Sequence, residues 1–427
     1  MFLNNTTKTK NSIQTKDKKS GLPYFLLLTL LFFDYSRPQS LFPPLGVLHI
    51  PMIIQAILLL TLLLSRNLFN LKNIQTKCFL GIIILMMIHV PIARNNFFAY
   101  NMTRSMLLKY IIFMSIITYV NSFEKLTKYI DFWIMINLVC ALIGLKHGGR
   151  IPNSAFMGDE NDFALIMNMA IPFAYFMFLE TDSTKKKILY LSACCIFIAA
   201  NVASFSRGGF VGLVPVILYC WYKTPKKVLS TIIVAIMISV LYFSASPKYW
   251  QEVKSIKEEN IQKGTGEDRW YLWNLAWHMF LDHPIIGVGQ GNAPWHISRY
   301  EPPGGLHGRS RAGRAIHSLY FTLIPELGII GILLFSGMLY FSYKDLKWIL
   351  KKEKEFLLKQ NQSEEIIQQM HKIRFIIFGI TGAMLGYLVS GIFLSVLYYP
   401  HFWLLISLCV ALRNIVINSK LEGNYGG

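Results

Sequence analysis

The sequence predicts an all-α, polytopic integral membrane protein with about twelve transmembrane helices and one long external loop that contains short helices. Of its 427 residues, 53% are hydrophobic and only 15% are charged, against about 25% charged residues in a typical soluble domain. The mean hydropathy is +0.41. This composition excludes a cytosolic enzyme, a disulfide-rich secreted module and a disordered tail protein.

Each transmembrane helix needs roughly 20 apolar residues to cross the bilayer core. The stretches that meet or approach this length are 22–36, 45–64, 77–93, 104–120, 128–145, 162–180, 188–203, 208–222, 228–245, 316–342, 373–394 and 397–417. They predict an N-terminal tail (1–21), nine helices within 22–245, a long loop (246–315), three further helices within 316–417 with a basic loop at 343–372, and a C-terminal tail (418–427).

The net charge of +19 is concentrated in alternate loops, as expected for loops retained in the cytoplasm. We therefore predict a multi-pass protein with both termini in the cytoplasm, and no nucleic-acid partner. Residues 1–20 are polar, and no small-residue cleavage site follows the first apolar run, so no signal peptide is predicted. The six cysteines fall in apolar stretches and are expected to be core residues.

The loop 246–315 lies on the external side in this topology, and its length indicates a functional element. Trp270, Trp273 and Trp277 share one helical face, and Pro284 discourages a longer helix. This pattern predicts an amphipathic helix at the outer membrane boundary, where tryptophan is favoured. The stripe would either anchor the loop or, at Trp270, contribute to substrate binding.

Arg269 stands at the start of that helix, where a guanidinium and backbone N–H groups together attract an anion. The alternative is a surface cation paired with Glu267 or Asp268. The cluster Gly287-Val-Gly-Gln-Gly291, which contains Gly289, can bring backbone N–H groups to a phosphate. A plain turn after the helix is the simpler interpretation.

Ser206-Arg-Gly-Gly209 opens the eighth predicted span on the outer side. Arg207 is a candidate phosphate ligand because the helix dipole favours an anion there and the glycines allow close approach. The alternative is an arginine that reaches the lipid head groups.

Arg311, Arg314 and His317 precede the tenth predicted span at the same outer face. An imidazole can remove a proton from a hydroxyl near neutral pH, although a histidine at a helix start is often structural. Glu326 is expected to be a buried hydrogen-bonding residue. The chain lacks an Asp-x-Asp pair, a Walker A motif and a zinc-ligand spacing, so no metal or cofactor is predicted.

Taken in their order along the chain, these motifs resemble those of the O-antigen ligase superfamily, which includes O-antigen polymerases. The resemblance rests on Ser206-Arg-Gly-Gly209, Arg269-Trp270, Asp282-His-Pro-Ile-Ile-Gly-Val-Gly289, His317-Ser-Leu-Tyr320 and Pro325-Glu-Leu-Gly-Ile-Ile-Gly331. The span layout covers nearly the whole chain, and the motifs cover about 120 residues. Ser318 departs from the asparagine that is common after the histidine. The stretch Asn153–Phe163 also looks like the family's loop before a helix, with no role assigned.

The resemblance implies a glycosyltransferase of the bacterial inner membrane that takes a glycan from an undecaprenyl diphosphate carrier on the periplasmic face. In a ligase the acceptor is a hydroxyl of the lipid A core. Carried over to this sequence, Arg207 and Arg269 would bind the diphosphate, and His317 would activate the acceptor hydroxyl. Arg311, Arg314, Trp270 and Gly289 are further candidates for substrate binding.

Two other functions remain open at this point. An O-antigen polymerase would use a second carrier-linked glycan as acceptor, and the sequence hardly separates it from a ligase. A lipid or polysaccharide transporter would favour charges near the membrane midplane. Arg104 and Lys109 in the fourth span are such charges, and they would either guide the carrier's phosphates or pair with Asp131 or Glu180.

Overall fold

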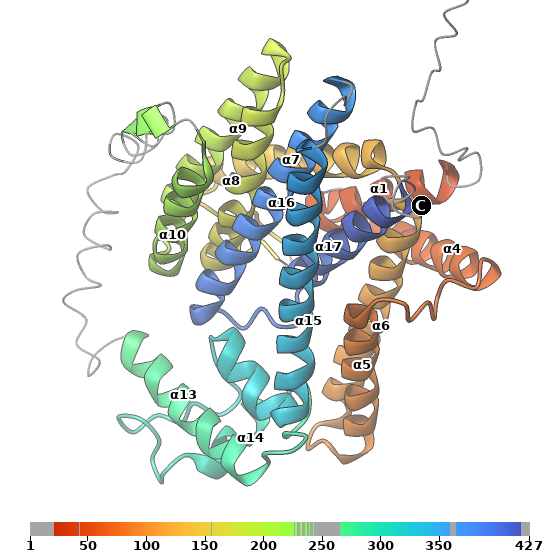
Figure 1. Ribbon diagram of the computed structural model, residues 1–427. Helices are drawn as coiled ribbons and strands as arrows, with labels where there is room; N and C mark the ends of the chain where they lie inside the picture. Colours follow the sequence, from red (N-terminus) through yellow and green to blue (C-terminus); the bar gives the residue numbers. More distant parts are fainter. Residues whose placement is uncertain are drawn as a thin grey trace, which may run out of the picture.

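The computed structural model describes residues 21–41, 43–154, 156–225, 265–358 and 364–419, together with 227–228, 231–232, 235–236, 239 and 242. The described parts of the chain are helical, apart from turns and connecting segments (Figure 1). The helices are α1 (Gly21–Ser36), α2 (Pro38–Leu41), α3 (Pro43–Val47), α4 (Ile50–Leu64), α5 (Ile74–Ile92), α6 (Asn96–Tyr119), α7 (Phe123–Lys146), α8 (Glu160–Glu180), α9 (Thr184–Ala203), α10 (Arg207–Lys223), α13 (Thr265–Asp282), α14 (Ala293–Tyr300), α15 (Leu319–Leu357), α16 (Glu364–Ser390), the 3-10 turn η1 (Gly391–Phe393) and α17 (Pro400–Asn418).

The predicted class is confirmed: this is an all-helical, multi-pass membrane protein. Eight helices of the described residues are long and apolar enough to cross a membrane. These are Pro44–Leu64, Ile74–Ile92, Phe123–Lys146, Glu160–Glu180, Thr184–Ala203, Leu319–Leu357, Ile367–Phe393 and Pro400–Asn418. Every other predicted span coincides with a helix except 228–245, which lies largely outside the described residues. The count of twelve stays a prediction.

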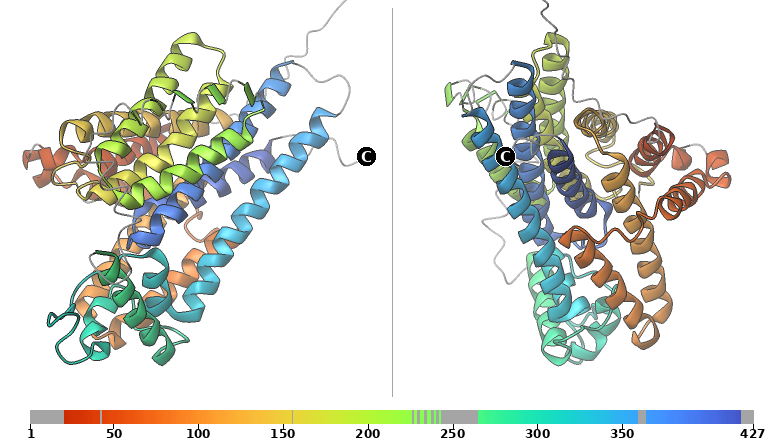
Figure 2. Two further views of the ribbon diagram at one scale, coloured as in Figure 1. Left: turned by 90° about the vertical axis from the view of Figure 1, so that its left-hand side faces the viewer. Right: turned by 45° about the vertical axis from the view of Figure 1, so that its right-hand side comes forward.

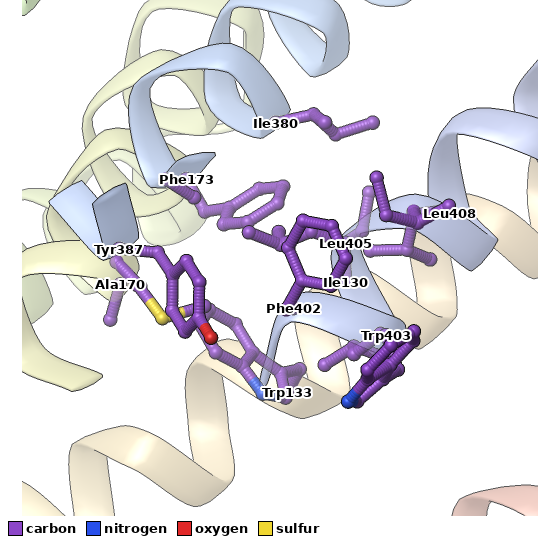
Figure 3. Close-up of a cluster of buried hydrophobic side chains, with 14 of the residues drawn as sticks. Ile130, Trp133, Ala170, Phe173, Ile380, Tyr387, Phe402, Trp403, Leu405 and Leu408 are labelled. Carbon is purple, nitrogen blue, oxygen red and sulfur yellow. The ribbon is translucent and has the colours of Figure 1, made fainter. Parts of the chain in front are cut away.

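The core of the bundle lies where α8, α16 and α17 meet (Figure 3). Phe402 stacks on Tyr387 at a centroid distance of 5.8 Å and on Phe335 at 4.4 Å. Trp403 stacks on Phe79 at 4.2 Å. Because lipid chains are as apolar as these side chains, close packing rather than escape from water holds such helices together.

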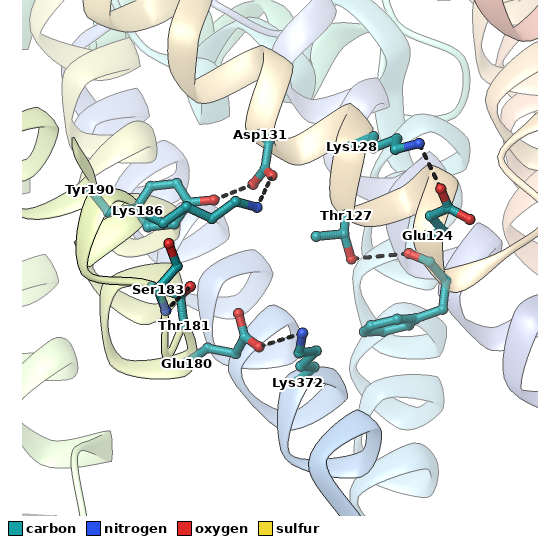
Figure 4. Close-up of polar contacts among 11 residues, drawn as sticks. Glu124, Thr127, Lys128, Asp131, Glu180, Thr181, Ser183, Lys186, Tyr190 and Lys372 are labelled. Atoms are coloured by element: carbon teal, nitrogen blue, oxygen red, sulfur yellow. Dashed lines mark hydrogen bonds and ion pairs between the residues drawn. The ribbon is translucent and has the colours of Figure 1, made fainter. Parts of the chain in front are cut away.

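Polar contacts join the helices at one end of the bundle (Figure 4). Asp131 of α7 accepts hydrogen bonds from Tyr190 at 2.7 Å and Lys186 at 3.3 Å, both on α9. Glu180, at the end of α8, pairs with Lys372 of α16 at 3.1 Å. These contacts fix the end of the bundle where α8 finishes and α9 begins.

The pairing considered for Arg104 and Lys109 is therefore not found, because both proposed carboxylates have partners on other helices. Lys109 instead donates to the Oγ of Ser105, one turn earlier on α6, at 2.5 Å.

Helix α15 differs from its prediction in two ways. Gly328 has φ 61° and ψ −163°, so the backbone breaks there and the predicted span 316–342 is not one continuous helix. The predicted loop 343–372 is helical up to Leu357, and α16 already begins at Glu364. Within this region Glu353 is buried and pairs with Arg374 of α16 at 2.8 Å. This ion pair joins the polar end of α15 to the polar start of α16.

Residues 265–317 form a small region at the end of the bundle where α15 begins, as both views in Figure 2 show. The predicted amphipathic helix is present as α13 and ends before Pro284. Leu272, Leu275 and Met279 on α13 pack against Ile297 of α14 and Ile316, which precedes α15. This second hydrophobic core orients the charged start of α13 relative to His317.

Candidate active site

Three helices begin close to one another at this end of the molecule. Asp159 is the N-cap of α8, Ser206 of α10 and Ser318 of α15, and each side chain accepts a hydrogen bond from a backbone N–H of its own first turn. The Oγ of Ser206 also donates to the Oδ1 of Asn161 at 2.7 Å, which joins the starts of α8 and α10. Helix N-termini carry partial positive charge, which favours an anion at the starts of α10 and α15, whereas the start of α8 already carries the carboxylates of Asp159, Glu160 and Asp162.

The two glycines after Arg207 have different roles. A Cβ on Gly209 would lie 2.5 Å from the Cβ of Ala164, whereas a Cβ on Gly208 would lie 3.5 Å from its nearest neighbour, the Cβ of Phe393. Gly209 therefore permits close packing of α10 on α8. The sequence-based explanation, that both glycines admit a ligand, does not account for this contact.

Phe393, in the segment between α16 and α17, connects the two candidate arginine positions. Its ring centroid lies 5.6 Å from the guanidinium carbon of Arg269, and its Cβ faces Gly208, the residue after Arg207. An aromatic face under a guanidinium holds the cation by a cation–π contact. The starts of α10 and α13 thus approach Phe393 from two directions.

Trp273 fixes α13 against the residues next to His317. Its Nε1–H donates to the backbone oxygen of Ile316 at 3.1 Å, and its ring stacks on Phe321 at 5.1 Å with an interplanar angle of 8°. Trp270 and Trp277 are 58% and 44% exposed, so they present the apolar stripe outward. Trp270 lies beside Trp273, at a centroid distance of 6.3 Å.

His317 has a backbone conformation that is unusual for a non-glycine residue, with φ 55°. Its N–H donates to the Oγ of Ser395 at 2.9 Å, and Ser395 also accepts from the Oγ1 of Thr322 at 3.3 Å. Left-handed backbone at a histidine costs about 1–3 kcal/mol and persists where the surroundings enforce it, often at functional sites. His317 is accessible to solvent, while neighbouring groups cover part of its imidazole.

The charges around His317 come from three segments. Partial burial and the positive charge of Arg269 lower the pKa of His317 below its ordinary value of 6.5; Arg314 lowers it further, and Asp159 opposes the shift. A lowered pKa keeps the imidazole neutral at pH 7, which is the state that a general base needs. Three segments that are separate in the sequence, at Asp159, Arg269 and His317, are thus brought within electrostatic reach of one another.

The stretch 153–163, to which the sequence assigned no role, lies at this site. Asp162 accepts a hydrogen bond from the hydroxyl of Tyr399 at 3.0 Å, and Asn161 contacts Ser206 as described above. Sequence reasoning did not identify Phe393, Ser395 or Tyr399. The acidic N-cap sequence 159–162, at the start of a predicted span, is a signal that could have indicated this region.

The remaining candidates have structural partners. Arg311 is buried and donates to the Oδ1 of Asp268 from Nη2 at 2.7 Å and from Nε at 3.1 Å. Arg314 is 60% exposed and lies 3.7 Å from the other carboxylate oxygen. Glu267 contacts His307 at 2.9 Å. Both carboxylates that were considered as partners of Arg269 thus interact with other side chains of the loop.

The glycine cluster forms a turn whose backbone N–H groups are used inside the protein. The N–H of Gly289 donates to the backbone oxygen of Glu326 at 3.0 Å, and that of Gly291 to its carboxylate at 2.7 Å. Glu326 is 1% exposed and also accepts from the hydroxyl of Tyr398 at 2.7 Å. This geometry agrees with the turn interpretation and with a structural role for Glu326, and it leaves Gly289 no N–H for a phosphate.

Two comparisons relate this chain to known proteins. The O-antigen ligase family matches residues 192–336, which include α10, α13, α14 and the start of α15. A relative is the teichuronic acid biosynthesis protein TuaE of Bacillus subtilis (strain 168), with 23% identity over 336 residues. That alignment covers 71% of this chain and 64% of the relative. The resemblance to the O-antigen ligase superfamily is thereby confirmed.

Proposed function

From the match of residues 192–336 to the O-antigen ligase family, we propose that this chain is a membrane glycosyltransferase. It transfers a glycan from an undecaprenyl diphosphate carrier to an acceptor hydroxyl at the periplasmic face. The observation that carries the proposal is the convergence of Arg269, His317 and the start of α10 around the segment 391–395.

The first chemical requirement is to stabilise the leaving group. When the bond between the anomeric carbon and the diphosphate oxygen breaks, negative charge grows on the diphosphate. Arg207 and Arg269, together with the N-terminus of α10, supply positive charge before the reaction begins. Each charge-assisted hydrogen bond contributes roughly 1.5–3 kcal/mol.

The second requirement is to activate the acceptor. A neutral His317 accepts the proton of the acceptor hydroxyl as its oxygen forms a bond to the anomeric carbon, which contributes about 10²–10⁴-fold in rate. The products are the glycosylated acceptor and undecaprenyl diphosphate, and the proton on His317 leaves to solvent. In this proposal the exposed Arg314 contacts the donor or the acceptor, whereas Arg311 supports the loop through Asp268.

The acceptor that we propose first is the lipid A core, as in an O-antigen ligase. The relative named for teichuronic acid biosynthesis favours a second candidate, polymerisation of carrier-linked repeat units. The same donor site and base serve both reactions, because only the molecule that carries the hydroxyl differs.

A lipopolysaccharide gel of a strain that lacks the gene tests this proposal. A ligase predicts bare lipid A core, with full-length polymer retained on its carrier, and rescue by the wild-type chain but not by His317→Ala. Core that carries a single repeat unit would identify a polymerase instead. Unchanged lipopolysaccharide and unchanged carrier-linked glycan would contradict both transfer functions.

A further inference from the structure

A cavity lies at the opposite end of α13 from Arg269. Its volume is about 920 Å³, and its lining comes from the end of α5, the turn after α13, and α14. Arg269 lies near the start of α13, and His283 follows its last residue, 14 positions later. At 1.5 Å per residue this separation corresponds to about 20 Å. This cavity is therefore separate from the site around His317.

A buried imidazole faces into the cavity. His296 is 7% exposed, and its Nδ1 has no hydrogen-bond partner among the described residues. Burial, Arg94, His283 and Arg299 lower the pKa of His296 to about 4, so the ring is neutral at pH 7 and carries one N–H. A buried polar atom without a partner is costly, which indicates that a ligand completes this position.

Positive charge surrounds that imidazole. Arg94 follows α5, Arg299 is on α14, and both are exposed in the cavity lining. The ion pairs of the described residues give neither guanidinium a carboxylate partner. The ring of His283 lies 6.2 Å from that of His296. Among the described residues no three histidine, cysteine or acidic side chains form a metal-binding group, so an anion is the ligand that this lining suits.

The rim of the cavity is apolar and lies at the end of a membrane span. Helix α5 is a candidate span that ends at Ile92, and Ile92 is 62% exposed. Ile285, after α13, is 64% exposed, and both isoleucines line the cavity. A small water-soluble anion would gain nothing from these two side chains, whereas a lipid with an anionic head group can contact them with its first chain carbons.

We propose that this cavity binds the phosphate head group of a membrane lipid. The guanidinium groups of Arg94 and Arg299 pair with the phosphate oxygens, and His296 forms a hydrogen bond with the head group. Ile92 and Ile285 contact the beginning of the hydrocarbon chain. The lipid is either an anionic phospholipid or a polyprenyl phosphate, since both present the same group at the same depth.

Native mass spectrometry of the purified full-length protein in detergent tests this site. The probes are dioctanoyl phosphatidylglycerol, farnesyl phosphate and inorganic phosphate, each titrated against wild type and Arg94→Gln/Arg299→Gln. We expect at least a tenfold loss of affinity for a lipid probe in the double variant, and a smaller loss in each single variant. Arg309→Gln, which removes an exposed arginine of the same loop region outside the cavity, should bind as wild type does.

The three probes distinguish the sources of the phosphate. Tighter binding of farnesyl phosphate assigns the site to a polyprenyl lipid, and tighter binding of phosphatidylglycerol assigns it to a phospholipid. Equal lipid binding by wild type and the double variant would overturn the proposal. Binding of inorganic phosphate as tight as that of both lipids would also overturn it, because the apolar rim would then contribute nothing.

Discussion

The backbone N–H of His317 donates a hydrogen bond to the Oγ of Ser395, across 78 residues of sequence, at 2.9 Å. This bond holds the histidine in its left-handed conformation at the start of α15. Ser395 belongs to the same connecting segment as Phe393, which lies against Arg269. One short segment between α16 and α17 therefore positions both the proposed base and a proposed diphosphate ligand.

Ser395→Ala removes the acceptor and should lower kcat about 3- to 10-fold, the equivalent of one hydrogen bond of roughly 1 kcal/mol, with little change in KM for the donor. Ser395→Thr keeps the hydroxyl and should restore most of the rate. Steady-state kinetics of the three proteins measures this. A fall in both variants, with parallel losses of folded protein, would mean that Ser395 serves stability alone.

The pH dependence of transfer should follow the charges around His317. A base with a lowered pKa is active above that pKa, so the acidic limb of kcat/KM should lie below 6.5 in the wild type. Arg314→Gln removes a charge that lowers the pKa of His317, and should move this limb to higher pH. Asp159→Asn keeps the N-cap but removes the opposing charge, and should move it to lower pH. Shifts in the same direction in both variants would rule out this electrostatic arrangement.

Gly209 and Gly208 provide a matched pair for the packing of α10 on α8. Gly209→Ala places a methyl group 2.5 Å from Ala164 and should lower the free energy of unfolding by about 1–3 kcal/mol, as overpacking does. Gly208→Ala meets its neighbour at 3.5 Å and should be tolerated. Thermal unfolding in detergent measures both, and equal stability of the two variants would contradict the close contact.

Glu326 should behave as a structural residue. Its carboxylate accepts from Gly291, Ala293 and Tyr398, so Glu326→Gln places an amide N–H₂ opposite a donor and should cost roughly 1–3 kcal/mol in stability. Glu355→Gln, in the surface pairs with Lys351 and Lys352, should change stability by about 0.5 kcal/mol or less. Unchanged stability of Glu326→Gln with abolished transfer would assign Glu326 to the chemistry instead.

The sequence was sufficient to predict the helical class and most of the described helices. Hydropathy marks a helix that must match the thickness of a bilayer, and an arginine at the start of such a helix stands out because it is costly there. The break at Gly328 was not visible because the residues on both sides of it continue the apolar run. The helix at 343–357 was missed because its charges resemble those of a loop.

The residues that bring the site together were harder to find. Phe393 and Ser395 are ordinary residues of a membrane-associated segment, and nothing in the local pattern relates them to His317 or Arg269. Their role depends on contacts between distant parts of the chain. The same holds for Gly291, whose N–H is used by Glu326, so that a pattern suggestive of phosphate binding becomes a structural turn.

The most direct test of the central claim is transfer by the purified protein in vesicles that contain an undecaprenyl diphosphate-linked glycan and an acceptor. The release of undecaprenyl diphosphate and the formation of glycosylated acceptor are measured for wild type, Arg269→Lys and His317→Ala. The account predicts that His317→Ala loses about 10²–10⁴-fold in turnover while it still binds the donor, whereas Arg269→Lys weakens both donor binding and turnover. Turnover of His317→Ala at the wild-type rate would contradict it.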